Sequence, residues 1–159
     1  MQPRLKYYQS APQGYSALRD METYVDECGL EESLLNLIKL RASQINHCAF
    51  CIDMHWKDAR AAGESEERLY MLDAWRESEV YSERERAGLA WTETLTLVAE
   101  TQAPDDAWEA VRTQFSDKEL ADLSLAIATI NVWNRLNVGF RTPSGIYQPR
   151  PRAETKTPD

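Results

Sequence analysis

Residues 34–55 read LLNLIKLRASQINHCAFCIDMH, and this stretch decides the fold class. Four of its apolar residues recur at the spacing of one helix face: Leu34, Ile38, Ala42 and Ile45. The pattern predicts a buried helix from about Glu31 to about Asn46. A turn at His47 is expected next, followed by a second helix that carries two cysteines.

Helical periodicity continues through most of the chain, and no alternating strand pattern is sustained. Helix starts are predicted at Ser16, Ser65, Ser82 and Ser116, the last two as capping boxes with Glu85 and Glu119. Helix ends are predicted at Gly29, Gly63 and Gly139. Four tryptophans lie on helical stripes and are expected in the core: Trp75, Trp91, Trp108 and Trp133. The sequence therefore predicts an all-α, single-domain helical bundle over residues 1–140. A proline-rich and charged tail, 141–159, is expected to be extended or disordered.

Composition excludes several classes of partner. The apolar fraction of 43% and the charged fraction of 28% are ordinary for a soluble globular protein. A net charge of −8 argues against nucleic acid and against anionic membrane surfaces, because both are themselves negative. No apolar run approaches membrane-spanning length, and the first residues form no apolar signal segment. We therefore expect a cytoplasmic protein.

The chemistry is predicted to lie at Cys48, Cys51 and His55. In a helix their i, i+3 and i+7 spacing places all three on one face. An imidazole one turn beyond Cys51 can accept its thiol proton, and as an imidazolium it would stabilise the thiolate. Free N–H groups at the helix start also favour an anionic sulfur. Cys51, nearer the base, is the candidate attacking thiol. Cys48 is the candidate resolving thiol, and together they can form a reducible disulfide.

Other interpretations of the cysteines remain open. Zinc could be bound by Cys48, Cys51 and His55, with His47 or Cys28 as a fourth ligand, but no second ligand pair exists in the sequence. Haem attachment is rejected, because it would need a histidine directly after the second cysteine, where this chain has Ile52. The pair could also be two inert buried thiols beside a hydrogen-bonded histidine. We expect Cys28, alone near a helix end, to be inert.

Three stretches resemble the carboxymuconolactone decarboxylase superfamily, in its alkyl hydroperoxidase D-like (AhpD-like) branch. They are LIKLRASQIN leading into CAFCIDMH at 37–55, ARAAGE at 59–64, and residues 83–93. The resemblance implies an all-helical AhpD-like fold that forms trimers or hexamers. It also implies antioxidant peroxidase or disulfide reductase activity without a metal or organic cofactor. The substrate would be a hydroperoxide or disulfide, and the reductant or peroxiredoxin partner is unidentified. In this family the residue matching Cys51 attacks, the one matching Cys48 resolves, and the one matching His55 relays the proton.

One departure from the family concerns the proton relay. The relay often begins at a glutamate twelve residues before the first cysteine, where this chain has Asn36. Glu32, one turn upstream on the same helix face, is a possible replacement. Two alternative functions are a carboxymuconolactone decarboxylase-type enzyme and a non-catalytic redox-sensing oligomer. The first is disfavoured because lactone decarboxylation has no need of a dithiol.

Overall fold

The computed structural model describes residues 2–149, and all the regular structure in this range is helical, which confirms the all-α prediction. In chain order the elements are α1 Tyr7–Ser10, α2 Pro12–Glu27, α3 Glu32–Ile45, α4 Ala49–Ala61, α5 Glu66–Tyr70, the 3-10 helix η1 Met71–Ala74, α6 Glu83–Thr96, α7 Val98–Thr101, α8 Asp105–Arg112 and α9 Asp117–Phe140.

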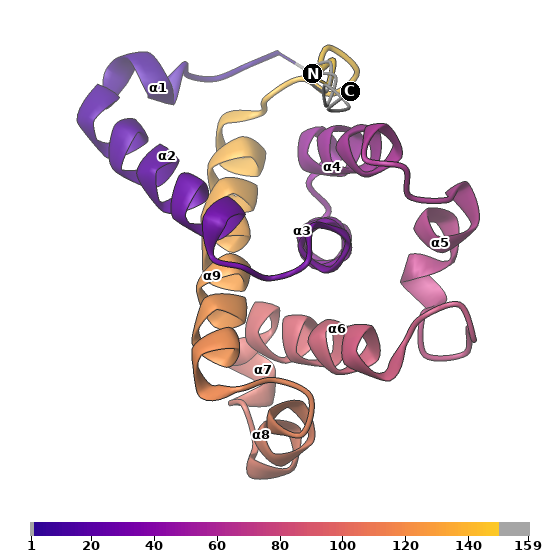
Figure 1. Ribbon diagram of the computed structural model, residues 1–159. Coiled ribbons are helices and arrows are strands. Elements are labelled where there is room, and N and C mark those ends of the chain that lie inside the picture. The colour runs from indigo at the N-terminus through magenta and orange to yellow at the C-terminus, as the bar shows by residue number, and fades with distance from the viewer. Residues whose placement is uncertain (1, 150–159) are drawn as a thin grey trace, which may run out of the picture.

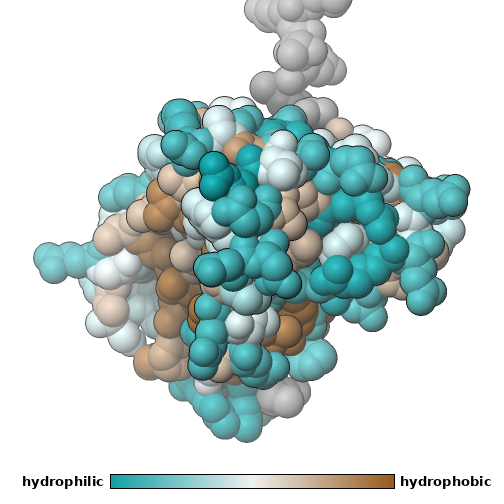
Figure 2. Space-filling view, turned by 90° about the horizontal axis from the view of Figure 1, so that it is seen from below, coloured by the Kyte–Doolittle hydropathy of each residue, from teal (hydrophilic) through white to brown (hydrophobic). Residues whose placement is uncertain are grey.

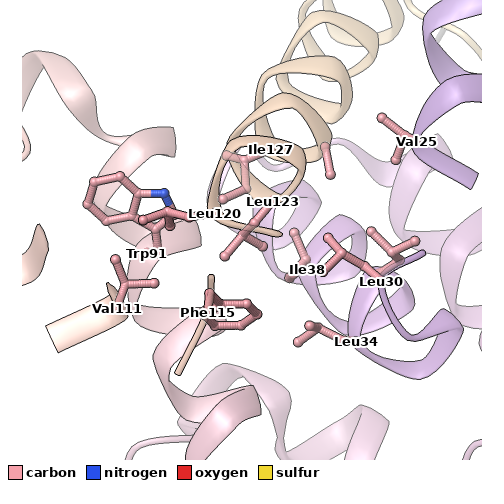
Figure 3. Close-up of a cluster of buried hydrophobic side chains, with 12 residues drawn as sticks. Val25, Leu30, Leu34, Ile38, Trp91, Val111, Phe115, Leu120, Leu123 and Ile127 are labelled. Atoms are coloured by element: carbon pink, nitrogen blue, oxygen red, sulfur yellow. The ribbon is translucent and has the colours of Figure 1, made fainter. Parts of the chain in front are cut away.

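Helix α3 is the centre of the fold. Figure 1 shows it end-on, with α2, α4, α6 and α9 arranged around it. Its apolar residues divide between two core clusters, because a helix enclosed by neighbours must bury more than one side. One cluster joins Leu34 and Ile38 to α9 and to Trp91 of α6 (Figure 3). The other joins Leu37 and Leu40 to α6 and to residues near α5. Burying each such leucine contributes roughly 1.5–3 kcal/mol.

A buried charge also lies on α3. Lys39 is only 7% exposed, and its Nζ donates to Glu22 at 2.6 Å and to Asp26 at 2.8 Å, both on α2. Glu22 in turn accepts a hydrogen bond from Trp133 Nε1 of α9 at 2.8 Å. The buried ammonium is therefore paired, as its burial requires, and it ties α2 to the centre of the bundle.

Most of the predicted helix boundaries are confirmed. The Ser82–Glu85 and Ser116–Glu119 capping boxes are both formed, and the Ser65 side chain caps α5. Gly29 and Gly63 follow the ends of α2 and α4 with φ of 99° and 96°. Such φ values strain a residue that has a Cβ atom, which is why glycine serves here as a terminator.

Two predicted boundaries are wrong. Ser16 lies inside α2, because Pro12 already supplies a favourable first residue four positions earlier. Gly139 does not end α9, which continues to Phe140 with Arg141 in the left-handed region. The last carbonyls are satisfied by Arg4, whose backbone N–H donates to Phe140 O and whose guanidinium donates to Gly139 O.

The prediction that all four tryptophans are core residues holds only in part. Trp75 and Trp91 are buried, and Trp133 is half-buried. For Trp108 the prediction is wrong, because this residue is 41% exposed. It lies on the short helix α8 at the edge of the bundle, and its ring centroid is 6.1 Å from that of Trp91.

The described part of the predicted tail, residues 141–149, is irregular and lies against α4. Lys57 Nζ donates to the Tyr147 carbonyl at 3.0 Å, the Tyr147 hydroxyl donates to Asp58 at 2.7 Å, and the Gly145 N–H donates to Asp53 at 3.0 Å. Residues 150–159 of that tail lie outside the described residues. Among residues 2–149, no helix is both long and apolar enough to span a membrane.

Candidate active site

The two predicted reactive cysteines lie at the junction between α3 and α4. His47 adopts a left-handed φ of 52°, which turns the chain sharply after α3, and the Cys48 N–H donates to Ser43 O at 3.0 Å. Cys48 is the N-cap of α4, and Cys51 lies in its first turn. Their Cα atoms are 5.3 Å apart and the two sulfurs form a disulfide. The turn therefore brings together the pair that the spacing predicted.

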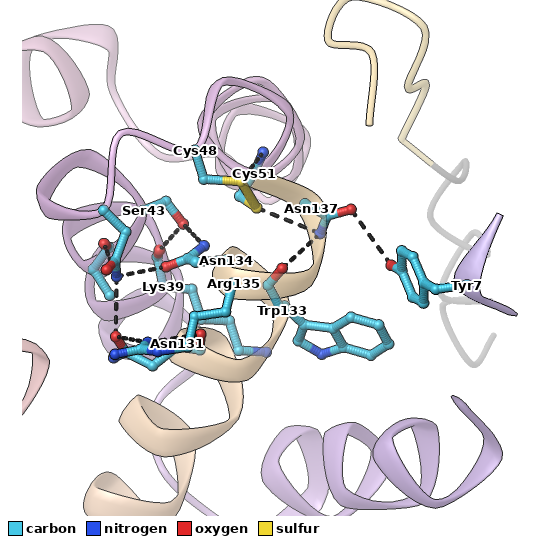
Figure 4. The surroundings of a disulfide bond; sticks show 12 residues. Tyr7, Lys39, Ser43, Cys48, Cys51, Asn131, Trp133, Asn134, Arg135 and Asn137 are labelled. Carbon is cyan, nitrogen blue, oxygen red and sulfur yellow. Dashed lines mark hydrogen bonds between the residues drawn. A yellow bond between two sulfur atoms is a disulfide. The ribbon is translucent and has the colours of Figure 1, made fainter. Parts of the chain in front are cut away.

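Each sulfur of the pair has its own hydrogen-bond donor. The Cys51 backbone N–H points to Cys48 Sγ at 3.4 Å, so the helix N-terminus favours an anion on Cys48. Cys51 Sγ instead accepts from the side-chain amide of Asn137, at 3.6 Å (Figure 4). The predicted helix-start effect therefore acts on Cys48 more directly than on Cys51.

His55 lies one turn beyond Cys51 and is 6% exposed. Its Nε2 atom is buried and makes no hydrogen bond in this disulfide form. Burial first, and then the positive charge of Lys39, lower its pKa from 6.5 to about 3. The ring is therefore neutral near pH 7, and its lowered pKa means that it can hold a thiol proton only transiently. The predicted second role, an imidazolium that persists beside a thiolate, is not favoured by this environment.

Solvent hardly reaches the pair in the single chain. Cys48 is 1% exposed and Cys51 is 0% exposed. A dry site strengthens every hydrogen bond and charge interaction within it.

Of the other sequence-predicted residues, Glu32 lies away from the pair. Glu32 is exposed in the first turn of α3, whereas Cys48 follows the opposite end of that helix. Eleven residues of helix, about 16 Å at 1.5 Å per residue, separate Glu32 from Ser43. The structure does not bring Glu32 to the cysteines, and its relay role stays a prediction. His47 is exposed, and the thiol of Cys28 is free and half-buried. Within residues 2–149, no three histidine, cysteine, aspartate or glutamate side chains are grouped as a metal site would require.

Sequence reasoning missed a row of buried amides on α9. Asn131, Asn134 and Asn137 repeat every third residue in the second half of α9, and all three are buried. Asn134 Nδ2 donates to the Ser43 hydroxyl at 3.1 Å, while Asn46 Nδ2 donates to both Asn131 and Asn134 at 3.0 Å. The row thus anchors the end of α3 and reaches Cys51 through Asn137. The regular spacing of asparagines was the available signal, since buried amides need partners.

The chain resembles known proteins over most of its length. The model of the carboxymuconolactone decarboxylase family matches residues 10–94, which include the whole cysteine region. The chain belongs to this family. An uncharacterised Bacillus subtilis protein, YdfG, is 43% identical over 140 residues, covering 88% of this chain and 95% of its own.

Solved structures place this family member in the AhpD-like branch. A protein of unknown function from Agrobacterium tumefaciens, named as a candidate antioxidant defence protein AhpD, is 47% identical with a TM-score of 0.89. That match covers 92% of this chain and 100% of the other. An uncharacterised peroxidase-related protein from Ralstonia eutropha, with an alkylhydroperoxidase AhpD core, shares the fold at 17% identity and a TM-score of 0.74, over 88% of this chain and 75% of its own.

Proposed function

We propose that this protein is a thiol-dependent hydroperoxidase or disulfide oxidoreductase that serves antioxidant defence. The observation that carries the proposal is the Cys48–Cys51 disulfide at the start of α4, with the neutral, buried His55 one turn away. A dithiol that closes to a disulfide can supply two electrons without a metal or an organic cofactor. The similarity to a candidate antioxidant defence protein is in agreement.

In the proposed peroxidase reaction, His55 accepts the proton of the Cys51 thiol. The thiolate attacks the distal oxygen of a hydroperoxide, the O–O bond breaks, and the alkoxide takes that proton to leave as an alcohol. Cys51 is now a sulfenic acid. The Cys48 sulfur attacks it, and water leaves as the disulfide closes. One hydroperoxide and two thiols thus give one alcohol, one water and one disulfide. An external dithiol or a peroxiredoxin partner would restore the reduced pair.

The proposal is tested by mixing reduced protein with tert-butyl hydroperoxide and measuring both the alcohol formed and the thiols lost. We expect one alcohol per two thiols lost, with repeated turnover when a dithiol reductant is supplied. Cys48→Ser should accumulate a sulfenic acid at Cys51, because no resolving thiol remains. Cys28→Ser is the matched control and should react like the unmodified protein. If the disulfide forms once and never turns over with any reductant, the protein is a redox switch instead. If Cys51→Ser remains active, the assignment of the attacking thiol is wrong.

We also expect the working form to be a homo-oligomer, a trimer or a hexamer. Helix α9 is apolar on several sides and leaves Leu125, Val132 and Val138 between 38% and 49% exposed. Figure 2 shows hydrophobic patches on the surface of the single chain, lying between hydrophilic side chains. Exposed apolar surface of this kind is typical of protein–protein contacts.

A further inference from the structure

We propose that Asn137 is the thiolate-stabilising residue of this site, because it donates a hydrogen bond from its side-chain amide to Cys51 Sγ. The inference rests on the proposed dithiol chemistry and adds to it a group that selects Cys51 as the sulfur that becomes anionic. Asn137 lies 86 positions after Cys51, on α9, and is only 5% exposed.

Both polar atoms of the Asn137 side-chain amide have hydrogen-bond partners. Its Nδ2 donates to the Trp133 carbonyl one turn earlier, at 3.0 Å, and to Cys51 Sγ at 3.6 Å. Its Oδ1 accepts from the Tyr7 hydroxyl at 3.4 Å. Figure 4 shows the amide between the sulfur on one side and the Tyr7 ring on the other.

These partners determine which way the amide faces. A backbone carbonyl can only accept, so the atom beside the Trp133 carbonyl must be the nitrogen. The second N–H of the same group then remains for the sulfur, and the oxygen faces the tyrosine. Burial raises the pKa of Tyr7, which keeps its hydroxyl protonated as a donor. The Tyr7 ring stacks on Phe140 with 5.5 Å between the ring centroids, which holds the hydroxyl near Asn137.

The contact has a different strength in the two redox states. A disulfide sulfur is a weak acceptor, whereas a thiolate accepts a charge-assisted hydrogen bond. The amide therefore stabilises the reduced, anionic form of Cys51 more than the oxidised form, and it lowers the pKa of the Cys51 thiol. When an external thiolate attacks Cys48 Sγ, the S–S bond breaks and its electron pair leaves on Cys51. Asn137 is placed to stabilise that negative charge on Cys51, because the Cys51 backbone N–H at the start of α4 donates to Cys48 Sγ instead.

Other titratable groups near the pair do not supply this donor. His55 of α4 is neutral and makes no hydrogen bond through Nε2. Lys39 of α3 has its ammonium committed to Glu22 and Asp26 of α2. Within the described residues, Asn137 is the side chain that donates a hydrogen bond to Cys51 Sγ.

The test compares Asn137→Leu and Asn137→Asp in reduced protein that also carries Cys28→Ser and Cys48→Ser, so that Cys51 is the sole cysteine. The Cys51 pKa is read from the ultraviolet absorbance of the thiolate against pH. We expect Asn137→Leu to raise that pKa by about one unit, a tenfold loss of thiolate at a fixed pH below the pKa. Asn137→Asp should raise it further, because a carboxylate repels the thiolate.

Asn134→Leu is the matched control: it removes a buried amide one turn earlier on α9 whose hydrogen bonds go to Ser43 and Asn46. It should leave the Cys51 pKa unchanged. Tyr7→Phe, a milder change, should raise the pKa by less than Asn137→Leu, because the amide loses only its orienting partner. An unchanged Cys51 pKa in folded Asn137→Leu or in Tyr7→Phe would overturn the inference. The assay needs neither peroxide nor reductant, so its outcome is separate from that of the proposed turnover.

Discussion

Acidification should destabilise the folded protein through His55 in a defined pH window. The pKa of this histidine is about 3 in the folded chain, against an ordinary value of 6.5. Between these values the unfolded chain binds a proton that the folded chain does not. The folded state therefore keeps its full stability above about pH 6.5 and loses stability as the pH falls toward 3. The slope approaches about 1.4 kcal/mol per pH unit, so the loss between about pH 7 and about pH 5 is about 2 kcal/mol.

The assay is urea unfolding of the disulfide form, followed by tryptophan fluorescence at fixed protein concentration and at several pH values in this range. The comparison is with His55→Leu, which fills the site without a titratable group. Carboxylates with a lowered pKa, such as Glu93 and Glu119, lose their stabilisation mainly below their ordinary value of 4.5 and are common to both proteins. The difference between the two pH profiles therefore isolates His55.

We expect the free energy of unfolding of the unmodified protein to fall by about 2 kcal/mol more than that of His55→Leu between these two pH values. Parallel profiles would show that His55 titrates alike in both states, and the argument from burial would then be wrong. An NMR titration of the His55 ring that gave a folded pKa near 6.5 would refute it directly.

Three further predictions concern the proton relay, a helix cap and assembly. Asn36→Glu should speed peroxide-dependent disulfide formation by roughly a hundredfold, since a carboxylate can accept a proton that an amide cannot; Asn36→Gln is its control, and an equal rate in both variants would contradict the relay argument. Ser116→Ala removes the side-chain cap of α9 and should lower the free energy of unfolding in urea by about 1 kcal/mol. An unchanged value would mean that the Ser116 hydroxyl does not stabilise the start of α9. Light scattering at micromolar concentration should show a trimer or hexamer, and a stable monomer would count against the apolar α9 surface as an interface.

Local sequence patterns were sufficient to predict most of the helices and the reactive pair. Capping boxes such as Ser82–Glu85, and terminators such as Gly63, act within a few residues of themselves and can be recognised in one dimension. The proximity of Cys48 and Cys51 is local in the same sense, because three residues of backbone bring the two sulfurs together. Where a second local signal competed, as Pro12 did with Ser16, the prediction failed by one turn of helix.

Tertiary structure alone decided the electrostatics of the site. His55 titrates far from its ordinary pKa because α4 is packed against other helices and Lys39 lies near, neither of which is visible in the order of residues around position 55. Asn137 contacts Cys51 only because α9 packs against the start of α4. The residues next to Asn137 in the sequence do not indicate which side chain it will contact. Local sequence therefore determined where the thiols lie along the chain. Packing determined which sulfur has a side-chain donor and which base is neutral, because burial and long-range contacts set both.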